Sequence, residues 1–475
     1  MQRNTELDDL HRAAVEIFES GLQAVDPRKT IRRVVEFDHS TLRICGDDYE
    51  VGDRKIYVLA IGKAALTAAT GLAEVLHDRI DGALITGPLG QGTPVILPGE
   101  PRERYSILTT GPIGQTIRLP LSAASAQRWQ AFSGGHPLPT MESLKAGWAS
   151  FRLLKKANYE RAVIIFVVSG GGSAMIEWPL AEQITLEDLR AANSLLITCG
   201  ASIAEINAVR RTFSAVKGGG LASAAPDADQ ITLLVSDTNP GDESNIASGP
   251  TMLPRSESPS ANEVVRRYDL LNRLPESIRQ LINTGPTREA SESRGLRKPY
   301  LLLDNQTAVN AAAIKAGEAG CLVAIADDIV EQPIEEGTPQ LIARLKEMIQ
   351  NRADSAPVCL LSGGEFACPV HGNGLGGRNL ETVLRCALEI SKQQDAGWRH
   401  VVVLSAGTDG IDGNTPAAGG FADETTIERA QARELNPQLH LNESDSFRLL
   451  ELLDSVLVTG PTGTNVRDLR VLLAV

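Results

Sequence analysis

Four apolar runs, each followed at once by a turn rich in glycine or acidic residues, limit the fold more than any other feature of the sequence. With their turns they read KIYVLAIGK (55–63), RAVIIFVVSGGGS (161–173), ITLLVSD (231–237) and HVVVLSAGTDGIDG (400–413). Each run is short, continuous and rich in β-branched residues, which is typical of a strand buried on both faces of its sheet. Helical patterns lie between the runs, so the sequence predicts alternating strands and helices.

The length of the chain indicates more than one domain. Its 475 residues exceed what a single hydrophobic core usually supports. The stretch NTGPTREASESRGLRKPY (283–300) is polar and rich in turn-forming residues, and series of alternating elements lie on both sides of it. We therefore expect an N-terminal α/β domain over residues 1–288 and a C-terminal α/β domain over residues 296–475.

Charge and cysteine usage narrow the class of partner and the compartment. The formal net charge of −13 is spread along the chain, which argues against nucleic acid or an anionic membrane as a partner. No window reaches the roughly 18 apolar residues that a membrane-spanning helix needs. The six cysteines lack the C-x-x-C spacing and are typical of buried thiols in a reducing compartment. We expect a cytoplasmic protein that acts on small molecules; the sequence leaves homo-oligomerisation open.

Three consecutive glycines, Gly170, Gly171 and Gly172, lie between a buried strand and a helix predicted to begin near Ser173. Without Cβ atoms, such a turn lets backbone N–H groups converge on an anion at the start of the helix. The alternative is a tight turn needed only for packing. The chain has neither G-x-x-x-x-G-K-[ST] nor G-x-G-x-x-G, so neither a P-loop kinase nor an ordinary NAD enzyme is indicated.

Lys63 occupies a similar junction between a strand and a helix. A lysine at the start of a helix is electrostatically unfavourable unless an anion compensates it, and a carboxylate or phosphate would do so. An ordinary surface lysine is the other interpretation. His136, between glycine and proline, is equally compatible with a structural role and with a substrate contact.

Acidic and basic residues gather around the third strand. Asp237 and Asp242 follow residues 231–235 and so lie at the carboxyl end of that strand, where open parallel sheets usually bind ligands. Asn207, Arg210 and Lys217 belong to one helical segment, and their spacing places them on one face. Such a face is either solvated charge or a clamp for a phosphoryl or carboxylate group.

In the second half of the chain, Glu365 follows a predicted strand, and Arg378 and Asn379 follow a loop with four glycines between residues 372 and 377. So many glycines give the loop more freedom than a simple reversal of the chain requires. We expect it to be mobile, to close over a ligand and to deliver the Arg378 guanidinium.

Asp409 and Asp412 lie in a further glycine-rich loop, after the strand that begins near residue 400. Asp-Gly pairs often serve only to form turns. Two carboxylates three residues apart also suit Mg²⁺, which takes one or two carboxylates together with substrate phosphates.

Six ordered motifs together resemble the glycerate 2-kinase family, also called the class II or MOFRL glycerate kinases. They are SGGGSAM, INAVRR-x3-SAVKGG-x-LA, SDTNPGDESNIASGPT, GLGGRNLE, SAGTDGIDG and TGPTGTNVRDLR. The resemblance covers nearly the whole chain, from Gly62 to the final strand. It implies ATP- and Mg²⁺-dependent transfer of a phosphoryl group to the 2-hydroxyl of D-glycerate, giving 2-phosphoglycerate and ADP. The expected fold is two α/β domains, the first a Rossmann-like three-layer α/β/α domain with a mainly parallel sheet, and the active site in the cleft between them.

The resemblance also implies roles for individual residues. Lys63 and Arg378 would be catalytic, and Asp237 would orient or deprotonate the attacking hydroxyl. Asp409 and Asp412 would lie near the metal. The residues expected to bind substrate or phosphate are Ser169, Gly170, Gly171, Gly172, Ser173, Asn207, Arg210, Lys217, Asp242, Glu365 and Asn379.

Two alternatives come from other functional classes. Members of this family have often been labelled hydroxypyruvate reductases, so a nicotinamide-dependent oxidoreductase is the second candidate, against which stands the missing dinucleotide fingerprint. A non-catalytic sugar-acid sensor is the third. The presence of Lys63, Asp237 and Arg378 within intact motifs argues against a sensor, which has no need of groups that hold a phosphoryl group.

Overall fold

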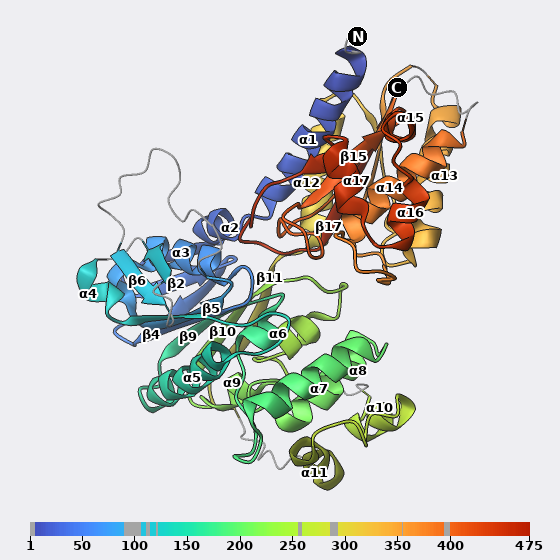
Figure 1. Ribbon diagram of the computed structural model, residues 1–475. Coiled ribbons are helices and arrows are strands. Elements are labelled where there is room, and N and C mark those ends of the chain that lie inside the picture. Colours follow the sequence, from blue (N-terminus) through green and yellow to red (C-terminus); the bar gives the residue numbers. More distant parts are fainter. Residues whose placement is uncertain are drawn as a thin grey trace. The chain divides into compact units, whose positions relative to one another are not determined.

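The computed structural model describes residues 5–89, 106–110, 115–119, 122–254, 259–285, 293–353, 355–393 and 400–475. The chain divides into two compact units (Figure 1). Pro27–Leu303 form one, here called the N-terminal unit; Met1–Asp26 and Asp304–Val475 form the other, the C-terminal unit. Among the described residues, no helix is both long and apolar enough to cross a membrane.

A six-stranded sheet forms the centre of the N-terminal unit. Its strands are β4 (Ile56–Ile61), β5 (Ile80–Gly87), β8 (Trp129–Ser133), β9 (Val163–Ser169), β10 (Asp229–Val235) and β11 (Arg297–Leu303). Their order is β11-β10-β9-β4-β5-β8, and every neighbouring pair is parallel. The order of the strands along the sheet thus reverses between β4 and β9, as in the doubly wound dinucleotide-binding fold. The prediction of a Rossmann-like parallel domain is confirmed.

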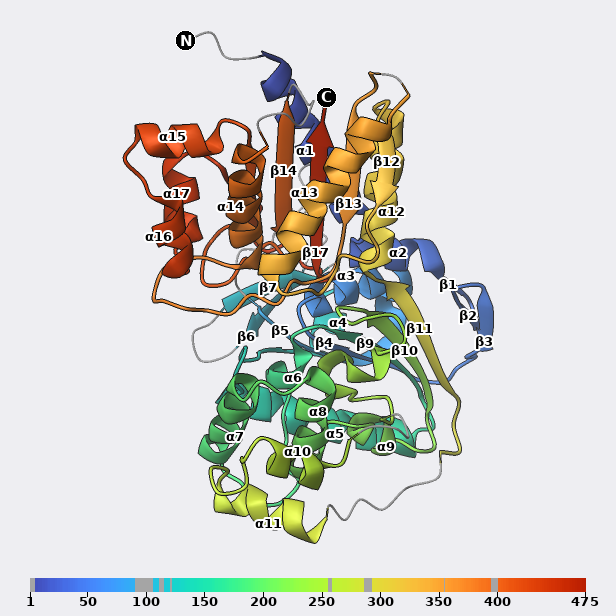
Figure 2. The ribbon, with the colours of Figure 1, turned by 90° about the vertical axis from the view of Figure 1, so that its right-hand side faces the viewer.

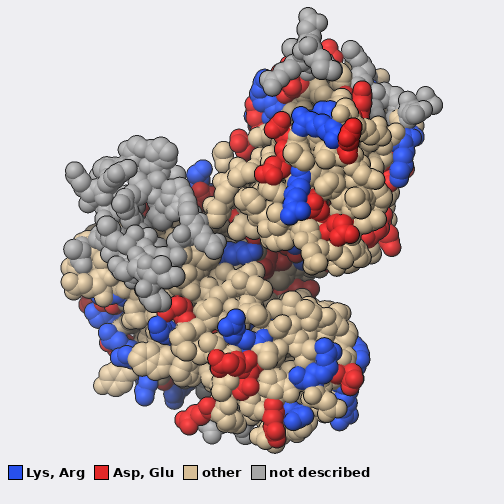
Figure 3. Space-filling view, in the orientation of Figure 1, with Lys and Arg blue, Asp and Glu red and all other residues tan. Residues whose placement is uncertain are grey.

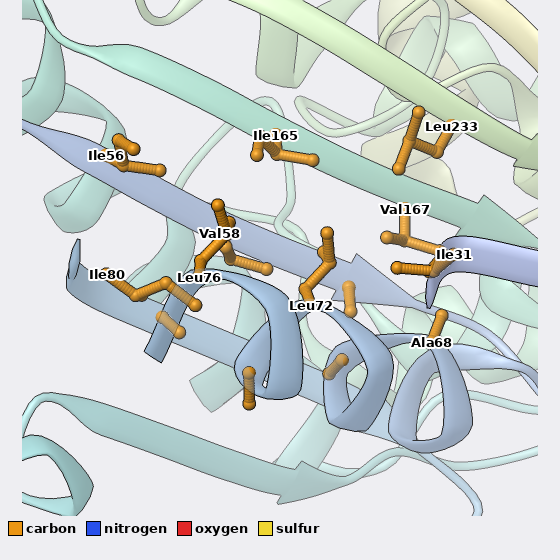
Figure 4. Packing of buried hydrophobic residues seen from close by; sticks show 14 of the residues in the cluster. Ile31, Ile56, Val58, Ala68, Leu72, Leu76, Ile80, Ile165, Val167 and Leu233 are labelled. Atoms are coloured by element: carbon orange, nitrogen blue, oxygen red, sulfur yellow. The ribbon is translucent and has the colours of Figure 1, made fainter. Parts of the chain in front are cut away.

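The continuous apolar runs are explained by cover on both faces of this sheet. Ile56 and Val58 of β4 point to one face, where they pack against α3 (Ala65–Leu76), as Figure 4 shows. Tyr57 and Leu59 point to the other face and pack against α5 (Met141–Tyr159). Because alternate residues of the strand enter different cores, all of them have to be apolar.

The other elements of the N-terminal unit extend these two layers. α2 (Pro27–Val34) joins α3 on its face of the sheet, together with a small antiparallel sheet of β1 (Val35–Asp38), β2 (Thr41–Ile44) and β3 (Asp47–Glu50). β6 (Ser106–Thr110) and β7 (Gln115–Leu119) form a hairpin. The remaining helices are η1 (His77–Arg79), α4 (Ala123–Ala126), α6 (Gly172–Met175), α7 (Leu186–Thr198), α8 (Ile203–Phe213), α9 (Gly220–Ser223), η3 (Glu243–Ser248), α10 (Ala261–Arg267) and α11 (Glu276–Thr284). α7, α8, α10 and α11 enclose a hydrophobic core of their own.

The C-terminal unit is built on a mixed sheet with the order β12-β13-β17-β14-β15-β16. The strands are β12 (Leu322–Ile325), β13 (Val358–Ser362), β14 (Val401–Gly407), β15 (Gly419–Asp423), β16 (Val456–Leu457) and β17 (Asp468–Ala474). Its longer helices are α1 (Thr5–Ala24), α12 (Asn305–Glu318), α13 (Ile334–Asn351) and α14 (Arg378–Ser391), and its shorter ones are α15 (Thr426–Ala432), α16 (Pro437–Asn442) and α17 (Ser446–Leu452). α1 and α12 cover one face of the sheet, and α13 and α14 cover the other (Figure 2).

The division into units differs from the predicted boundaries in two places. Leu10, Ala14, Ile17 and Phe18 form a helical stripe on α1 that packs against the sheet of the C-terminal unit, so residues 1–26 do not belong with the first domain. The turn-rich stretch at 283–300 precedes the edge strand β11 of the first sheet and does not separate the domains; the division falls between Leu303 and Asp304. Residues 286–292, inside the predicted boundary, lie outside the described residues.

Candidate functional site

Because the chain carries a net negative charge, a site for an anionic ligand needs a local cluster of cationic side chains and backbone N–H groups. Figure 3 shows Lys and Arg side chains interspersed with Asp and Glu over the face that it draws. A parallel sheet offers one defined place for such a site, the carboxyl ends of the strands at the point where the strand order reverses. In the N-terminal unit that point is the pair β4 and β9.

The loops that leave β4 and β9 are bonded to each other. The backbone N–H of Lys63 donates to the carbonyl oxygen of Gly170 at 2.9 Å. Ser169 bridges the two strand ends, since its hydroxyl accepts from the Ala64 N–H and donates to the Ile61 carbonyl, both at 3.0 Å. Ser169 is fully buried, so it fixes the position of Lys63 instead of offering a free hydroxyl to a ligand.

The three glycines between β9 and α6 serve close packing. Gly171 has a φ of +78°, a left-handed conformation that favours glycine. A Cβ on Gly172 would lie 2.7 Å from Ala247 Cβ and 2.8 Å from Ile61 Cγ2. The helix that follows has only four residues, too few for the expected N-terminal dipole. These contacts support the packing interpretation for Gly172, and anion binding by Gly170, Gly171 and Gly172 stays a prediction.

Two side chains approach this glycine turn. A Cβ built on Gly171 would lie 3.2 Å from Lys63 Cγ and 3.3 Å from His136 Cδ2. Lys63 is partly exposed and directly precedes α3, whose N-cap residue Ala64 provides no side-chain hydrogen bond. The start of α3 therefore places a lysine next to the positive end of the helix dipole, an arrangement that favours a bound anion.

A chain of hydrogen-bonded polar side chains links the glycine turn after β9 to the turn after β10. Ser173 shares a hydrogen bond of 2.7 Å with Ser248, whose hydroxyl donates to Oδ1 of Asn207 at 2.7 Å. Asn207 is fully buried and also donates to the carbonyl of Asn245 at 3.4 Å. Asn207 and Ser173 thus hold the turn after β10, and the structure assigns them structural contacts. Ser248, with a left-handed φ of +64°, was not singled out in the sequence.

Two basic residues of the 207–217 segment, Arg210 and Lys217, are buried. Lys217 is 0% exposed and forms an ion pair with the equally buried Glu177. Its ammonium group is committed to a buried carboxylate, which supports a structural contact. The role of Lys217 in substrate binding stays a prediction. Arg210 is 5% exposed, its Nε donates to Asn193 at 2.8 Å, and burial lowers its pKa to about 10.

Asp237 and Asp242 lie where the sequence places them, in the turn after β10, and both are partly exposed. β10 is the neighbour of β9, so this turn lies at the same edge of the sheet as the Ser169–Gly172 turn. The N–H of Asp242 donates to the Asn239 carbonyl at 2.9 Å, and η3 follows at once. The structure therefore supports their placement at the strand ends and assigns no ligand to either.

In the C-terminal unit, one cluster contains three of the predicted site residues, Glu365, Arg378 and Asn379. β17 runs antiparallel to both β13 and β14, so its first residue, Asp468, meets the carboxyl ends of those two strands. The guanidinium of Arg378 donates to both oxygens of Asp468, from Nε at 2.6 Å and from Nη2 at 3.0 Å. Nη2 also donates to Glu365 at 2.7 Å. Asn379 completes the cluster by donating to Asp468 at 2.9 Å.

Asp468 was missed in the sequence, although it lies within the TGPTGTNVRDLR motif. A lone aspartate at the start of the last strand gives no local signal, since only the strand order brings it against Arg378. Asn379 is 1% exposed and accepts from the Ser405 hydroxyl at 2.7 Å, so its amide is part of the framework. Glu365 and Arg378 remain partly exposed.

Asp412 does not suit the predicted magnesium site. Its Oδ1 accepts from the backbone N–H of Asn379 at 3.1 Å, and its Oδ2 accepts from that of Leu380 at 2.8 Å. Asp412 therefore caps the N-terminus of α14, and it is 2% exposed. Burial raises its pKa to about 7, against the opposing effect of these N–H groups. In the part of the chain that the structure describes, no group of three or more His, Cys, Asp or Glu residues could hold a metal ion.

Replacing Asp412 by asparagine is expected to lower the stability of the fold by about 1–2 kcal/mol. The side-chain amide has one oxygen, so it cannot accept from both backbone N–H groups at the start of α14. The dependence of the reaction rate on Mg²⁺ concentration should not change. Thermal unfolding and a Mg²⁺ titration of the purified variant measure the two effects separately. A shifted Mg²⁺ dependence at unchanged stability would restore Asp412 as a metal ligand.

The glycine-rich loop before α14 is packed against residues 443–446 and Asp412. Cβ atoms on Gly372 and Gly374 would lie 2.6 and 2.4 Å from atoms of Glu443 and Asp445, and one on Gly377 would lie 2.3 Å from the Asp412 carboxylate. The loop N–H of Leu375 donates to Asp445 at 2.8 Å. These glycines allow close approach to residues 443–446, and closure of the loop over a ligand stays a prediction.

Comparisons with known proteins agree over the length of the chain. Residues 13–283 match the family model described as a domain of unknown function, DUF4147, and residues 358–468 match the MOFRL family. A D-glycerate 2-kinase from Thermotoga maritima is 30% identical over 463 residues, which cover 97% of this chain and 98% of that protein. A protein from Agrobacterium vitis that carries the name hydroxypyruvate reductase is 31% identical over 444 residues, which cover 89% and 99%.

Solved structures lead to the same family. A crystal structure of glycerate kinase from Thermotoga maritima superposes with a TM-score of 0.75 at 28% identity, covering 98% of this chain and 100% of that chain. The DUF4147 model alone matches more than half of the chain, and the Thermotoga enzyme aligns with almost all of it. The chain therefore belongs to the glycerate 2-kinase (MOFRL) family.

Proposed function

We propose that this chain is a glycerate 2-kinase, which transfers the γ-phosphoryl group of ATP to the 2-hydroxyl of D-glycerate. The observation that carries the proposal is the alignment of 97% of the chain with a D-glycerate 2-kinase. It is supported by the position of Lys63 at the strand-order reversal of the first sheet and by the cluster around Arg378 in the second. The products would be 2-phosphoglycerate and ADP.

The residues fit what phosphoryl transfer asks of a protein. That reaction needs positioned reactants and cations for the charge on the transferred group, and little covalent chemistry. Lys63, next to the start of α3, and Arg378, at the start of α14, are the cations proposed for this task. Asp237 is proposed to orient or deprotonate the attacking hydroxyl, and Arg210 to bind the carboxylate. The placing of the active site between the two domains stays a prediction.

Magnesium is proposed to arrive with ATP as a complex with its phosphates, because Mg²⁺ is usually bound through substrate phosphates and one or two carboxylates. Asp409 remains a candidate for a contact to that complex. Its carboxylate accepts from the Ile411 N–H at 3.1 Å, so it is held within its own turn and is partly exposed.

Incubation of the purified protein with D-glycerate, ATP and Mg²⁺ should release ADP, measured through pyruvate kinase and lactate dehydrogenase. After ATP and the coupling enzymes are removed, enolase should convert the product directly to phosphoenolpyruvate, because enolase accepts 2-phosphoglycerate. ADP release without enolase turnover unless a phosphoglycerate mutase is added would identify a 3-kinase. No ADP release would contradict a glycerate kinase altogether.

A hydroxypyruvate reductase is the second candidate because the strand order of the first sheet is that of dinucleotide-binding domains. Relatives from Agrobacterium vitis also carry that name. The turn after β4 reads GKAA and lacks the glycine fingerprint that brings a pyrophosphate against the backbone. Oxidation of NADH by hydroxypyruvate at a rate comparable to the kinase assay would favour this candidate.

A further inference from the structure

Asp468 is a fully buried carboxylate whose main partner is a residue proposed to be catalytic. It is 0% exposed and lies at the start of β17, between the ends of β13 and β14. Burying a charge is costly unless it is paired and hydrogen-bonded, so a carboxylate in this position needs a compensating group. The nearest such group is the guanidinium of Arg378, and the buried Arg470 lies farther away, with Nη2 3.9 Å from Oδ2 of Asp468.

The contact is the two-pronged pairing that arginine forms best with a carboxylate. Nε and Nη2 of Arg378 donate to the two oxygens of Asp468, at 2.6 and 3.0 Å, and Nη2 donates in addition to Glu365. Such a pair fixes the plane of the guanidinium and its rotation. Among the described residues, Nη1 of Arg378 has no hydrogen-bond partner, so its two N–H groups are left to donate elsewhere.

Asp468 is itself held in place. Its Oδ1 accepts from the amide of Asn379 at 2.9 Å, and its backbone N–H donates to the Gly364 carbonyl at 3.2 Å. Burial acts to raise the pKa of Asp468, but the Arg378 guanidinium outweighs it and keeps that pKa below its usual range. The carboxylate therefore stays charged at neutral pH and Arg378 stays paired to it.

We propose that Asp468 is a positioning residue for phosphoryl transfer: it holds Arg378 in one orientation so that Nη1 donates to the transferred phosphoryl group. The inference rests on the proposed function. An arginine side chain that is free to rotate loses rotamer entropy when a substrate immobilises it. Asp468 removes most of that loss beforehand, because two of the three guanidinium nitrogens are already fixed. This saving in rotamer entropy lowers the free energy of the transition state, in which the guanidinium stabilises the charge on the phosphoryl oxygens.

Asp468→Asn is the first variant to test, because it keeps the shape and removes the charge. We expect kcat to fall about 10²-fold, the cost of a misplaced catalytic group, with a change in KM of less than about threefold. The matched control is Asp423→Asn, another buried carboxylate of the same unit, which bonds to His11 and Thr425 away from the cluster. The control should lose stability and keep its kcat.

A double-mutant cycle distinguishes positioning from a structural role. If Asp468 acts through Arg378, Asp468→Asn should have no further effect on kcat in an Arg378→Ala background, since the group it positions is absent. Multiplicative losses in the double variant would overturn the inference while leaving the kinase assignment intact. Full activity of Arg378→Ala alone would instead contradict the proposed role of Arg378.

Chemical rescue gives a second test that does not depend on how well Asp468→Asn folds. In Arg378→Ala, the carboxylates of Asp468 and Glu365 remain as a preformed receptor for a planar cation. Guanidinium at non-denaturing concentration should restore part of kcat, and methylammonium at the same concentration should not, because it cannot bridge two oxygens. Equal rescue by both, or rescue by neither, would contradict the inference.

Discussion

Replacing Arg378 by alanine is expected to lower kcat/KM for glycerate by about 10³-fold or more, the effect of losing an arginine that stabilises a transferred phosphoryl group. The guanidinium is held by Asp468 and Glu365 through Nε and Nη2. The loss should fall mainly on kcat, because the charge that this group stabilises is greatest in the transition state.

The Arg378 variants are also expected to differ in stability. Alanine leaves the buried Asp468 without its main counter-charge, which costs about 3–5 kcal/mol when one partner of a buried pair is removed. Arg378→Lys keeps the positive charge and should be more stable than Arg378→Ala. It cannot form the two-pronged pair, so we still expect a large loss of kcat.

Arg385→Ala is the matched control for Arg378. Arg385 lies seven residues further along the same helix and pairs with Glu381 and Glu335. Its removal should change thermal unfolding and leave the ADP-release rate close to that of the unchanged protein. If Arg378→Lys, folded by circular dichroism, turned over as fast as this control, Arg378 would have no part in the chemistry.

The strand ends could be predicted from the sequence because the signal there is local. A continuous apolar run identifies a strand covered on both faces, and the residues that follow it must lie at the carboxyl edge of the sheet. Lys63, Ser169 and Asp237 follow three such runs, and the structure places them after β4, β9 and β10, which are neighbours. The sequence thus predicted which residues gather, though not which of them are bonded to each other.

Buried pairing could not be predicted, since it depends on residues far apart in the chain. Lys217 has the helical spacing of a basic face, yet its partner Glu177 comes from a loop 40 residues earlier. Asp468 and Arg378 are 90 residues apart and meet only because β17 inserts between β13 and β14. No periodicity reports such a contact, so a buried charge and an exposed one look alike in the sequence.

Glycine has two structural uses that the sequence does not distinguish. Both the 170–172 turn and the 372–377 loop were interpreted as ligand-binding because glycine gives conformational freedom. Glycine also allows two backbones to approach closely, and this second property is the one used at Gly172 and Gly374. Composition cannot separate the two uses, because the neighbouring atoms that a Cβ would meet come from elsewhere in the fold.

Lys63→Ala is expected to lower kcat/KM by about 10²–10³-fold, the range found when one group that stabilises developing charge is removed. Lys63 follows β4 at the strand-order reversal, and its backbone N–H is fixed to Gly170. Lys63 is partly exposed, so the loss of activity is expected without a large loss of stability.

Lys55→Ala is the control, because Lys55 stands at the amino end of the same strand, where it pairs with Asp81 at 2.9 Å. Both variants remove one lysine charge next to β4, but only Lys63 lies at the edge where a parallel sheet binds ligands. Steady-state ADP release and thermal unfolding with and without ATP should separate them: Lys55→Ala should keep the rate, and Lys63→Ala should lose it while unfolding at a normal temperature. If both variants kept their activity, the cation at the strand-order reversal would have no catalytic role, and the phosphoryl group would have to be held by Arg378 and other residues.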